Sequence, residues 1–235
     1  MPKKNIRNFE ELTDDWRLLL AADIVVFGVI KSKLHVLLVK RKFEPGAGDW
    51  AIPGGFVRAD ESLEQAALRE LKEETGFQKE GYLEQLYTFG ELKRDPRARV
   101  VATAYMVLVS EPEKIKIKAS DDAAAVDWFP INSLPVLAFG SAHKDILLYA
   151  WQRLKWKFEY TNVAMTMLPK QFTLSELQKL YEAVLAEKLD KRNFRKKILS
   201  LDLVEVLDEV KKELGRPAQL YKAKNKELQI FSRIV

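Results

Sequence analysis

Cysteine is absent from the 235-residue sequence, and histidine occurs only twice, at His35 and His143. The absence of cysteine excludes a disulfide framework, a thiolate zinc site and a cysteine nucleophile. Neither histidine lies in a pattern typical of a catalytic pair. Their roles are therefore open, with a structural or surface position favoured over catalysis.

Long apolar runs are also missing. No run approaches the roughly 20 residues that cross a membrane, which excludes an integral membrane protein. The N-terminal segment MPKKNIRNFEELTDDW is polar and lacks the apolar core of a signal peptide. We therefore expect a cytoplasmic protein with no membrane partner.

The residues that are present favour a folded chain with an uneven charge distribution. Hydrophobic residues make up 47% of the sequence, which is enough for one large or two small cores and excludes disorder over most of the length. The formal net charge is +5, and residues 141–235 carry the excess with 19 basic and 12 acidic residues. This excess predicts a polyanionic partner, and a lysine-rich solvated surface is the alternative.

The residue pattern predicts a mixed α/β part followed by a mostly helical part. Runs of apolar and β-branched residues predict strands at 20–31, 33–40, 82–89, 99–109, 114–118 and 126–131. Helical composition or spacing predicts helices at 61–75 and 141–158. Because the pattern changes near residue 160, we place one domain at 1–158 (a core at about 20–140, then a connecting helix) and a second at 159–235.

Three glutamates lie on one face of the first predicted helix. Glu70, Glu73 and Glu74 stand at positions i, i+3 and i+4, where like charges repel. An ordinary acidic surface helix is one explanation. A cation among the carboxylates is the other, because hard oxygen ligands suit Mg²⁺ or Mn²⁺ and hold them against phosphates. Gly54 and Gly55 allow the backbone to approach such a site closely.

The spacing around these glutamates resembles the Nudix box. At the specified positions of that motif the sequence has Gly55, Glu61, Arg69-Glu70-Leu71, Glu73-Glu74 and Gly76-Phe77. The resemblance to the Nudix hydrolase family covers about residues 20–140 and implies an α/β/α sandwich with a mixed sheet. It also implies metal-assisted cleavage of a nucleoside diphosphate linked to another group, through attack of water on phosphorus.

The resemblance assigns roles to residues of the box by position. The metal ligands would be the Gly55 carbonyl, Glu70, Glu73 and Glu74. Arg69 would orient the glutamates through charge-assisted hydrogen bonds. Glu61 or one of the three ligand glutamates would help to deprotonate water, and the sequence does not distinguish among them.

The segments that flank the box resemble the ADP-ribose-type branch of the family. They read DWAIPGG before the box, and YLEQLYTFG and RDPR after it. Arg41, Arg94 and Arg97 are candidate contacts to the nucleotide, and Phe89 or Tyr87 is a candidate to stack on its base. The alternative places the aromatic rings in the core and the arginines in surface loops.

The C-terminal part predicts two capped helices followed by a hairpin. Thr173 and Glu176 form a capping box that begins one helix, and Asp190 caps the next. Two strands are expected at 203–207 and 218–222, joined by a turn at 211–215. This is the order of a winged helix-turn-helix, in which the second helix enters the major groove of DNA.

The second of these helices is strongly basic, with five basic residues in the seven positions 191–197. Its lysines and arginines predict phosphate contacts, and Asn193 or Arg192 is a candidate to read base edges. We expect DNA contacts from Thr173, Lys191, Arg192, Asn193, Arg195, Lys196, Lys197 and Arg216. The alternative is a helical extension for dimerisation with a solvated lysine face.

The two parts together resemble the Nudix-related transcriptional regulators, NrtR. Besides the box, the segments EYT, FTLSEL, DKRNFR and GRPAQLY carry this resemblance. It implies a homodimer that represses genes of NAD metabolism and is released from its DNA operator by ADP-ribose or a related nucleotide. Some members sense sugars instead. Because the box is intact, hydrolysis of the ligand stays open.

Two other functions compete with this interpretation. One is a plain Mg²⁺-dependent pyrophosphatase of the ADP-ribose type, whose basic C-terminal part serves only assembly. The other is a Nudix enzyme that uses the basic part on RNA. In the regulator, the ligand would change the dimer geometry so that two recognition helices no longer match half-sites one helical turn apart.

Overall fold

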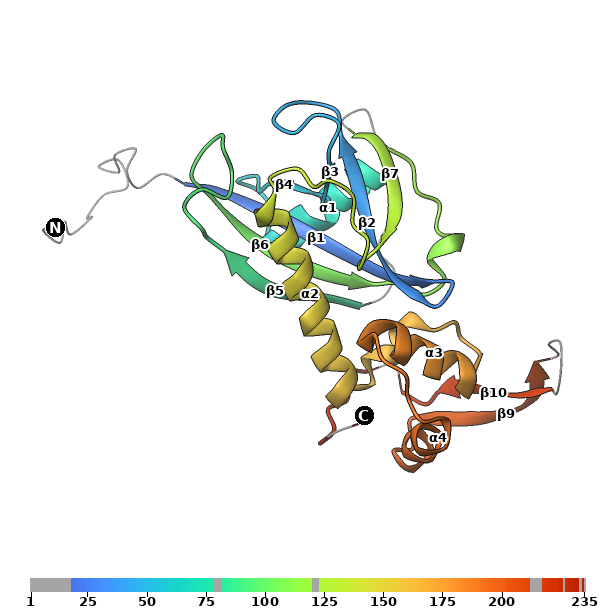
Figure 1. Cartoon of the computed structure of the whole chain (residues 1–235). Coiled ribbons are helices and arrows are strands. Elements are labelled where there is room, and N and C mark those ends of the chain that lie inside the picture. The colour runs from blue at the N-terminus through green and yellow to red at the C-terminus, as the bar shows by residue number, and fades with distance from the viewer. Residues whose placement is uncertain are drawn as a thin grey trace, which may run out of the picture.

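The computed structural model describes residues 18–77, 82–119, 123–211, 217–225, 227–232 and 234. In this part of the chain, seven strands form a mixed sheet and three form a second sheet (Figure 1). The first sheet contains β1 (Leu19–Ile30), β2 (Lys33–Arg41), β3 (Trp50–Ala51), β4 (Gly54–Phe56), β5 (Tyr82–Phe89), β6 (Val100–Leu108) and β7 (Ala123–Pro130). The second contains β8 (Phe172–Thr173), β9 (Val204–Lys211) and β10 (Ala218–Ala223).

Strand β1 is the centre of the first sheet. It pairs antiparallel with β2 and β4 and parallel with β6. Its side chains are buried on both faces of the sheet, because each face is covered by a helix. Ile24 and Val26 pack in the cluster that includes α1 (Leu63–Thr75), and Val25 and Phe27 pack in the cluster that includes α2 (Ser141–Tyr160). The expected α/β/α sandwich with a mixed sheet is confirmed.

Helix α1 is defined by local signals at both ends. The Ser62 hydroxyl accepts a hydrogen bond from the Gln65 backbone N–H, and the Gln65 side-chain oxygen accepts one from the Ser62 backbone N–H, which completes a capping box. Gly76 ends the helix with φ of 69°, in the left-handed region that glycine adopts without strain. Ala66, Ala67 and Leu71 are buried against the sheet, so the opposite, acidic face of the helix is fixed in direction.

Helix α2 connects the two parts of the chain. Its start at Ser141 agrees with the prediction, and it continues two residues beyond the expected end. The Lys157 ammonium, 6% exposed, pairs with Glu84 of β5 at 2.8 Å and ties α2 to the sheet. Phe158 contacts the ring of Tyr181, which in turn contacts Phe194. One hydrophobic cluster therefore runs from the first sheet through α2 into the C-terminal helices.

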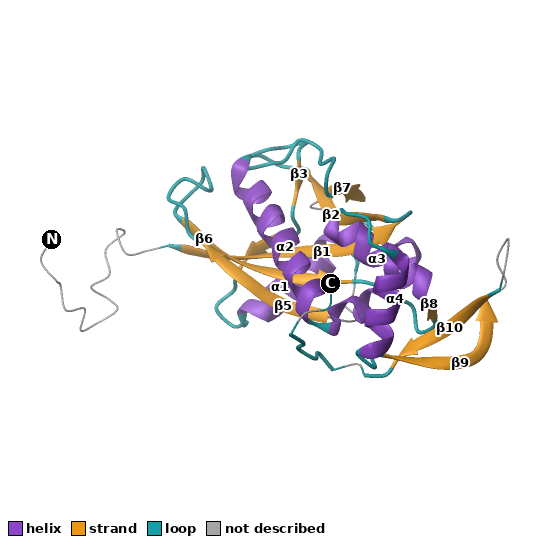
Figure 2. Ribbon diagram, turned by 60° about the horizontal axis from the view of Figure 1, so that its bottom comes forward, coloured by secondary structure: helices purple, strands orange, loops and turns teal. Residues whose placement is uncertain are grey.

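The C-terminal part has the predicted order of a winged helix-turn-helix. Helix α3 (Leu174–Leu185) begins at the Thr173 cap, and α4 (Lys191–Ser200) begins at Asp190, whose carboxylate accepts from the Asn193 N–H at 2.8 Å. Strands β9 and β10 form the hairpin and project from the body of the molecule (Figure 2). The first of them is longer than predicted and ends at Lys211.

One predicted strand is wrong. Lys114 is the last residue of a short 3₁₀ helix, η3 (Pro112–Lys114), and residues 115–118 after it form no ladder. The backbone N–H groups of Lys114 and Ile115 donate to the carbonyls of Glu111 and Pro112, so local turn bonds replace a partner strand. A second 3₁₀ helix, η4 (Asn162–Met167), and the short strands β3, β4 and β8 were not predicted. Among the described residues, no helix combines the length and apolar character needed to cross a bilayer.

Candidate functional site

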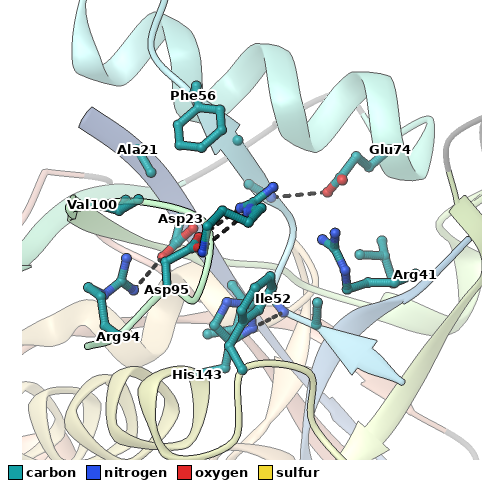
Figure 3. Close-up of a pocket in the computed structure, with 16 residues that line it drawn as sticks. Ala21, Asp23, Arg41, Ile52, Phe56, Glu74, Arg94, Asp95, Val100 and His143 are labelled. Atoms are coloured by element: carbon teal, nitrogen blue, oxygen red, sulfur yellow. Dashed lines mark hydrogen bonds and ion pairs between the residues drawn. The ribbon is translucent and has the colours of Figure 1, made fainter. Parts of the chain in front are cut away.

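A cleft opens between the first sheet, α1 and the start of α2 (Figure 3). It is built mainly from β1, β2, the β3–β4 segment, the loop after β5 and the residues just before α2. The residues that line it are Ala21, Asp23, Val39, Arg41, Ala51, Ile52, Gly54, Gly55, Phe56, Glu74, Arg94, Asp95, Arg97, Val100, Phe139 and His143.

The three predicted nucleotide arginines all line this cleft, in two different settings. Arg41 and Arg97 lie against the ring of Phe139, at 4.9 and 5.5 Å from its centre. Arg94 instead is 6% exposed at its side chain and pairs with the buried Asp23 at 3.3 Å. Arg97 also pairs with Asp95 at 2.7 Å, while Arg94 holds the wall of the cleft through Asp23.

Phe89 does not line the cleft. It is 7% exposed and packs edge-on against Tyr149 of α2, 5.8 Å between ring centres. This placement does not favour base stacking by Phe89, because the ring is buried and packs against Tyr87 and Tyr149. The aromatic rings on the cleft wall are Phe56 and Phe139. Phe56 directly follows the two glycines of the box, which was an available signal, whereas nothing in the sequence marks Phe139.

The acidic face of α1 is organised by Arg69. Its guanidinium donates to Glu61 at 2.6 and 2.8 Å, to Glu70 at 2.6 Å and to Glu73 at 2.9 Å. Hydrogen bonds from Arg69 lower the pKa of the Glu61 carboxyl to about 2. Arg69 thus holds three carboxylates of the box in one network, as the sequence predicted for its orienting role.

Glu74 faces the other way, onto the cleft wall. Its carboxylate accepts a hydrogen bond from the Gly54 N–H at 3.0 Å, and burial raises the pKa of this carboxyl to about 8. A Cβ atom at Gly55 would overlap the Glu70 carboxylate. The glycine therefore allows that carboxylate to lie directly beside the strand, and a larger residue would force it to move.

The donor set suits a hard divalent cation. Glu70, Glu73, Glu74 and the Gly55 carbonyl offer oxygen atoms only, which is the ligand chemistry of Mg²⁺ and Mn²⁺. The side chain missing at Gly55 leaves room for the Glu70 carboxylate beside the strand. Among the described residues, no three acidic or histidine side chains already converge as a ligand shell. The chemistry of these ligands still fits the cation. In the structure, Arg69 pairs with two of the four, Glu70 and Glu73.

His143 is a structural residue of the cleft wall. It lies in the first turn of α2, is 7% exposed, and its Nδ1 accepts from the Ile52 N–H at 3.2 Å. Burial, with the nearby Arg94 and Arg41 charges, lowers the pKa of His143 to about 3. The imidazole is neutral at pH 7 and links α2 to the segment that leads into the glycine pair.

We expect His143 to make the protein less stable in acid. The pKa is about 3 in the folded state and about 6.5 in the unfolded chain, so the unfolded chain binds the proton first. Its stabilising contribution is complete above pH 6.5 and is lost as the pH falls toward 3. By pH 5 the loss is about 2 kcal/mol.

His143→Gln keeps an acceptor for the Ile52 N–H and removes the titration. Urea unfolding at pH 7 and pH 5 should show a pH-dependent loss of free energy about 2 kcal/mol smaller for this variant than for the unmodified chain. His35→Gln serves as the control, because the hydrogen bond of that ring is to the Lys33 carbonyl of its own hairpin. Equal losses for the unmodified chain and His143→Gln would contradict the assignment.

The predicted DNA contacts separate into three groups. Lys191, Arg192, Asn193 and Lys196 are exposed on α4, and Lys197 is half-buried. Phe194 and Ile198 are buried against the rest of the domain, so the exposed set faces outward. Arg216 lies outside the described residues.

Two of the predicted contacts point inward. Thr173 is 4% exposed, and its hydroxyl accepts from the Glu176 N–H as the cap of α3. Arg195 donates to the Ser175 hydroxyl at 2.9 Å. Neither side chain is presented to a ligand as Lys196 is, because each is used within the domain. These interactions within the domain favour structural roles for Thr173 and Arg195 over contacts to DNA.

Two protein-family models match this chain. The NUDIX domain matches residues 19–152, and the NrtR DNA-binding winged helix domain matches residues 164–223. The chain is also similar to the ADPR responsive transcriptional repressor NtrR of Acinetobacter baylyi, with 36% identity over 207 residues, 87% of this chain and 81% of the relative.

Two solved structures are similar as well. NrtR of Shewanella oneidensis complexed with a 27mer DNA superposes with a TM-score of 0.79 at 35% identity, covering 92% of this chain and 99% of that one. The NUDIX domain of the same protein complexed with ADP ribose gives a TM-score of 0.55 at 34% identity, covering 62% of this chain and 95% of that one.

Proposed function

This chain belongs to the NrtR family of NUDIX-containing proteins, and from that premise we propose that it is a transcriptional repressor released from DNA by ADP-ribose. The observation that carries the proposal is the pairing of two sites in one chain. A cleft with Arg41 and Arg97 on its wall lies in the NUDIX domain, and a helix with an outward basic face lies in the winged helix domain.

The cleft suits a molecule with a diphosphate and a flat base. Arg41 and Arg97 offer charge-assisted hydrogen bonds to phosphate or ribose. The rings of Phe56 and Phe139 line the same space and offer faces for a base. Glu70, Glu73, Glu74 and the Gly55 carbonyl would hold Mg²⁺ or Mn²⁺, which neutralises a diphosphate and lowers the pKa of bound water.

Helix α2 extends from the cleft to the winged helix domain and so connects the two sites. Its first turn carries His143 on the cleft wall, and its last turn carries Phe158 against Tyr181 of α3. Trp151, between them, donates from its indole N–H to the Val184 carbonyl at 2.9 Å. A ligand that binds more tightly to one placement of α2 would shift the winged helix domains of a homodimer away from operator spacing.

The test begins with a DNA ligand obtained without knowledge of the operator. The full chain selects duplexes from a random pool, and fluorescence anisotropy then measures binding of the selected duplex. We expect ADP-ribose with Mg²⁺ to weaken this binding at least tenfold, an ordinary size for coupling between two sites. Light scattering of the complex tests the predicted homodimer.

Three control ligands separate the alternatives in the same assay. AMP tests the nucleotide half alone, free ribose tests a sugar sensor, and a single-stranded RNA of matched sequence tests an RNA-binding role. Failure to select any duplex, or binding that ADP-ribose leaves unchanged, would contradict the proposal. Release by ribose alone would place the chain among the sugar-sensing regulators.

A second function, hydrolysis of ADP-ribose to AMP and ribose 5-phosphate, is favoured by the intact box. Arg69 holds Glu61, Glu70 and Glu73 together, and Glu74 faces the cleft. Chromatography of the nucleotides after incubation with Mg²⁺ should detect both products, and excess chelator should prevent them. Intact ADP-ribose after prolonged incubation would exclude hydrolysis while leaving the repressor proposal in place.

A further inference from the structure

The first turn of α3 is a polar junction where three parts of the winged helix domain meet. The Glu176 carboxylate accepts from the Thr173 backbone N–H at 2.7 Å and from the Lys211 ammonium, at the end of β9, at 2.6 Å. Thr173 itself is paired with Leu220 of β10. The start of α3 is therefore held by the hairpin from two directions, and it forms a fixed point within the domain.

Arg195 attaches α4 to this fixed point. Its guanidinium donates to the Ser175 hydroxyl, one residue from Glu176, at 2.9 Å. The Arg195 Nε is buried and has no hydrogen-bond partner within the described part of the chain. A buried donor without a partner costs free energy, so stability alone would favour an apolar residue at this position.

The bond supplies a constraint that the apolar contacts of α4 do not. Phe194 and Ile198 lie one turn apart on the buried face, and they fix how closely α4 packs. Two contacts along one stripe leave rotation about the helix axis weakly determined. Arg195 lies to one side of that stripe, so its bond to Ser175 resists such rotation.

Rotation matters for base reading more than for phosphate binding. Side-chain tips lie about 6 Å from a helix axis, so a rotation of about 20° displaces them by about 2 Å. That shift exceeds the tolerance of a hydrogen bond to a base edge. A flexible lysine still reaches a phosphate after the same shift, because phosphate attraction is not directional in this way.

We propose that Arg195 is a positioning residue, which sets the rotation of the recognition helix through Ser175 and so determines sequence specificity without contacting DNA. This inference rests on the proposed DNA-binding function and assigns one basic residue of α4 a different task from its exposed neighbours. It predicts that loss of the Arg195 side chain lowers sequence specificity but leaves the electrostatic part of the DNA affinity unchanged.

The experiment uses the full chain, the duplex it selects from a random pool, and a scrambled duplex of equal composition. For Arg195→Ala we expect the affinity ratio between the two duplexes to fall about tenfold or more, as expected for loss of a hydrogen bond from a charged donor. The slope of log affinity against log salt should stay unchanged. Ser175→Ala, which keeps every charge, should lower the ratio in the same direction.

The double variant tests whether the two residues act through one bond. If they do, adding Ser175→Ala to Arg195→Ala should lower the affinity ratio between the two duplexes little further. Circular dichroism melting and ADP-ribose binding check that each variant is folded, and Ser175→Ala decides the question if Arg195→Ala unfolds.

The proposal is overturned if Ser175→Ala leaves the ratio unchanged. It is also overturned if Arg195→Ala weakens both duplexes alike and lowers the salt slope by about 0.9, the signature of a lost phosphate contact. If the chain selects no duplex from the pool, that result contradicts the proposed DNA-binding function, and this inference fails with it.

Discussion

Replacement of both Arg192 and Lys196 by alanine is expected to lower DNA affinity about a hundredfold at physiological salt. The two side chains are exposed and lie one turn apart on α4, opposite the buried Phe194 and Ile198. A base-edge contact from Arg192 would contribute about 1–3 kcal/mol, and a phosphate contact from Lys196 would weaken binding to any sequence. The slope of log affinity against log salt should fall by about 0.9 for each bound protomer if Lys196 alone binds a phosphate, and by about 1.8 if both residues do.

A matched control removes two charges elsewhere. Lys116 and Lys144 are exposed lysines of the NUDIX domain, so Lys116→Ala with Lys144→Ala changes the net charge equally. Anisotropy titrations at several salt concentrations should give this control nearly the affinity and slope of the unmodified chain. Equal losses in both double variants would mean that net charge, rather than α4, governs binding. If neither double variant loses DNA affinity, the alternative interpretation of α4 as a solvated basic face would be favoured.

The response to ADP-ribose serves as an internal check on the α4 variant. Neither Arg192 nor Lys196 lines the cleft, and exposed substitutions away from structural contacts change stability by less than about 0.5 kcal/mol. Calorimetry should therefore show unchanged affinity for ADP-ribose. A variant that loses DNA and ADP-ribose together has lost its fold and says nothing about recognition.

The elements that the sequence predicted best are those with signals at their own ends. Thr173 and Asp190 begin α3 and α4, where the structure places the predicted caps. The error at 114–118 has the opposite origin. Alternation of apolar and basic residues is typical of an exposed strand, but a strand also needs a partner, and sequence pattern alone does not supply one.

In the candidate site, too, the sequence predicts local placements well and long-range placements poorly. The glutamates of the box and Arg69 lie within one helix and the turn before it, so their mutual placement follows from helical spacing. The pair between Asp23 and Arg94 joins residues 71 positions apart, and Phe139 enters the cleft only because α2 begins there. Such placements depend on how the sheet and helices pack, which no local pattern encodes.

Arg195 shows the same limit on a smaller scale. In the sequence it is one of five basic residues on α4, and composition gives no reason to separate it from Arg192 or Lys196. Its position beside the buried stripe, together with a hydroxyl on α3, turns it inward. A helical wheel places the residue at the boundary, but only the packing of α3 decides the direction of its side chain.

Replacement of both Arg41 and Arg97 by alanine should greatly raise the ADP-ribose concentration needed to release DNA while leaving DNA binding intact. Both guanidiniums lie beside the ring of Phe139. Burial lowers the pKa of Arg41, and the nearby Arg97 charge lowers it further, so a bound diphosphate would reduce the repulsion between the two cations. Two charge-assisted hydrogen bonds, each about 1.5 kcal/mol, predict an affinity loss of about a hundredfold.

The control for this pair uses lysines from the same two segments. Lys42 and Lys93 are exposed and do not line the cleft, so Lys42→Ala with Lys93→Ala removes equal charge nearby. Calorimetry should give the control its full ADP-ribose affinity, and anisotropy should show normal release of DNA. In the Arg41 and Arg97 variant, release should require about a hundredfold more ligand, because coupling is reciprocal and the free energy of ligand binding drives it. Unchanged release in that variant would move the effector out of this cleft, and a parallel loss of DNA affinity would show that the arginines support the fold rather than the ligand.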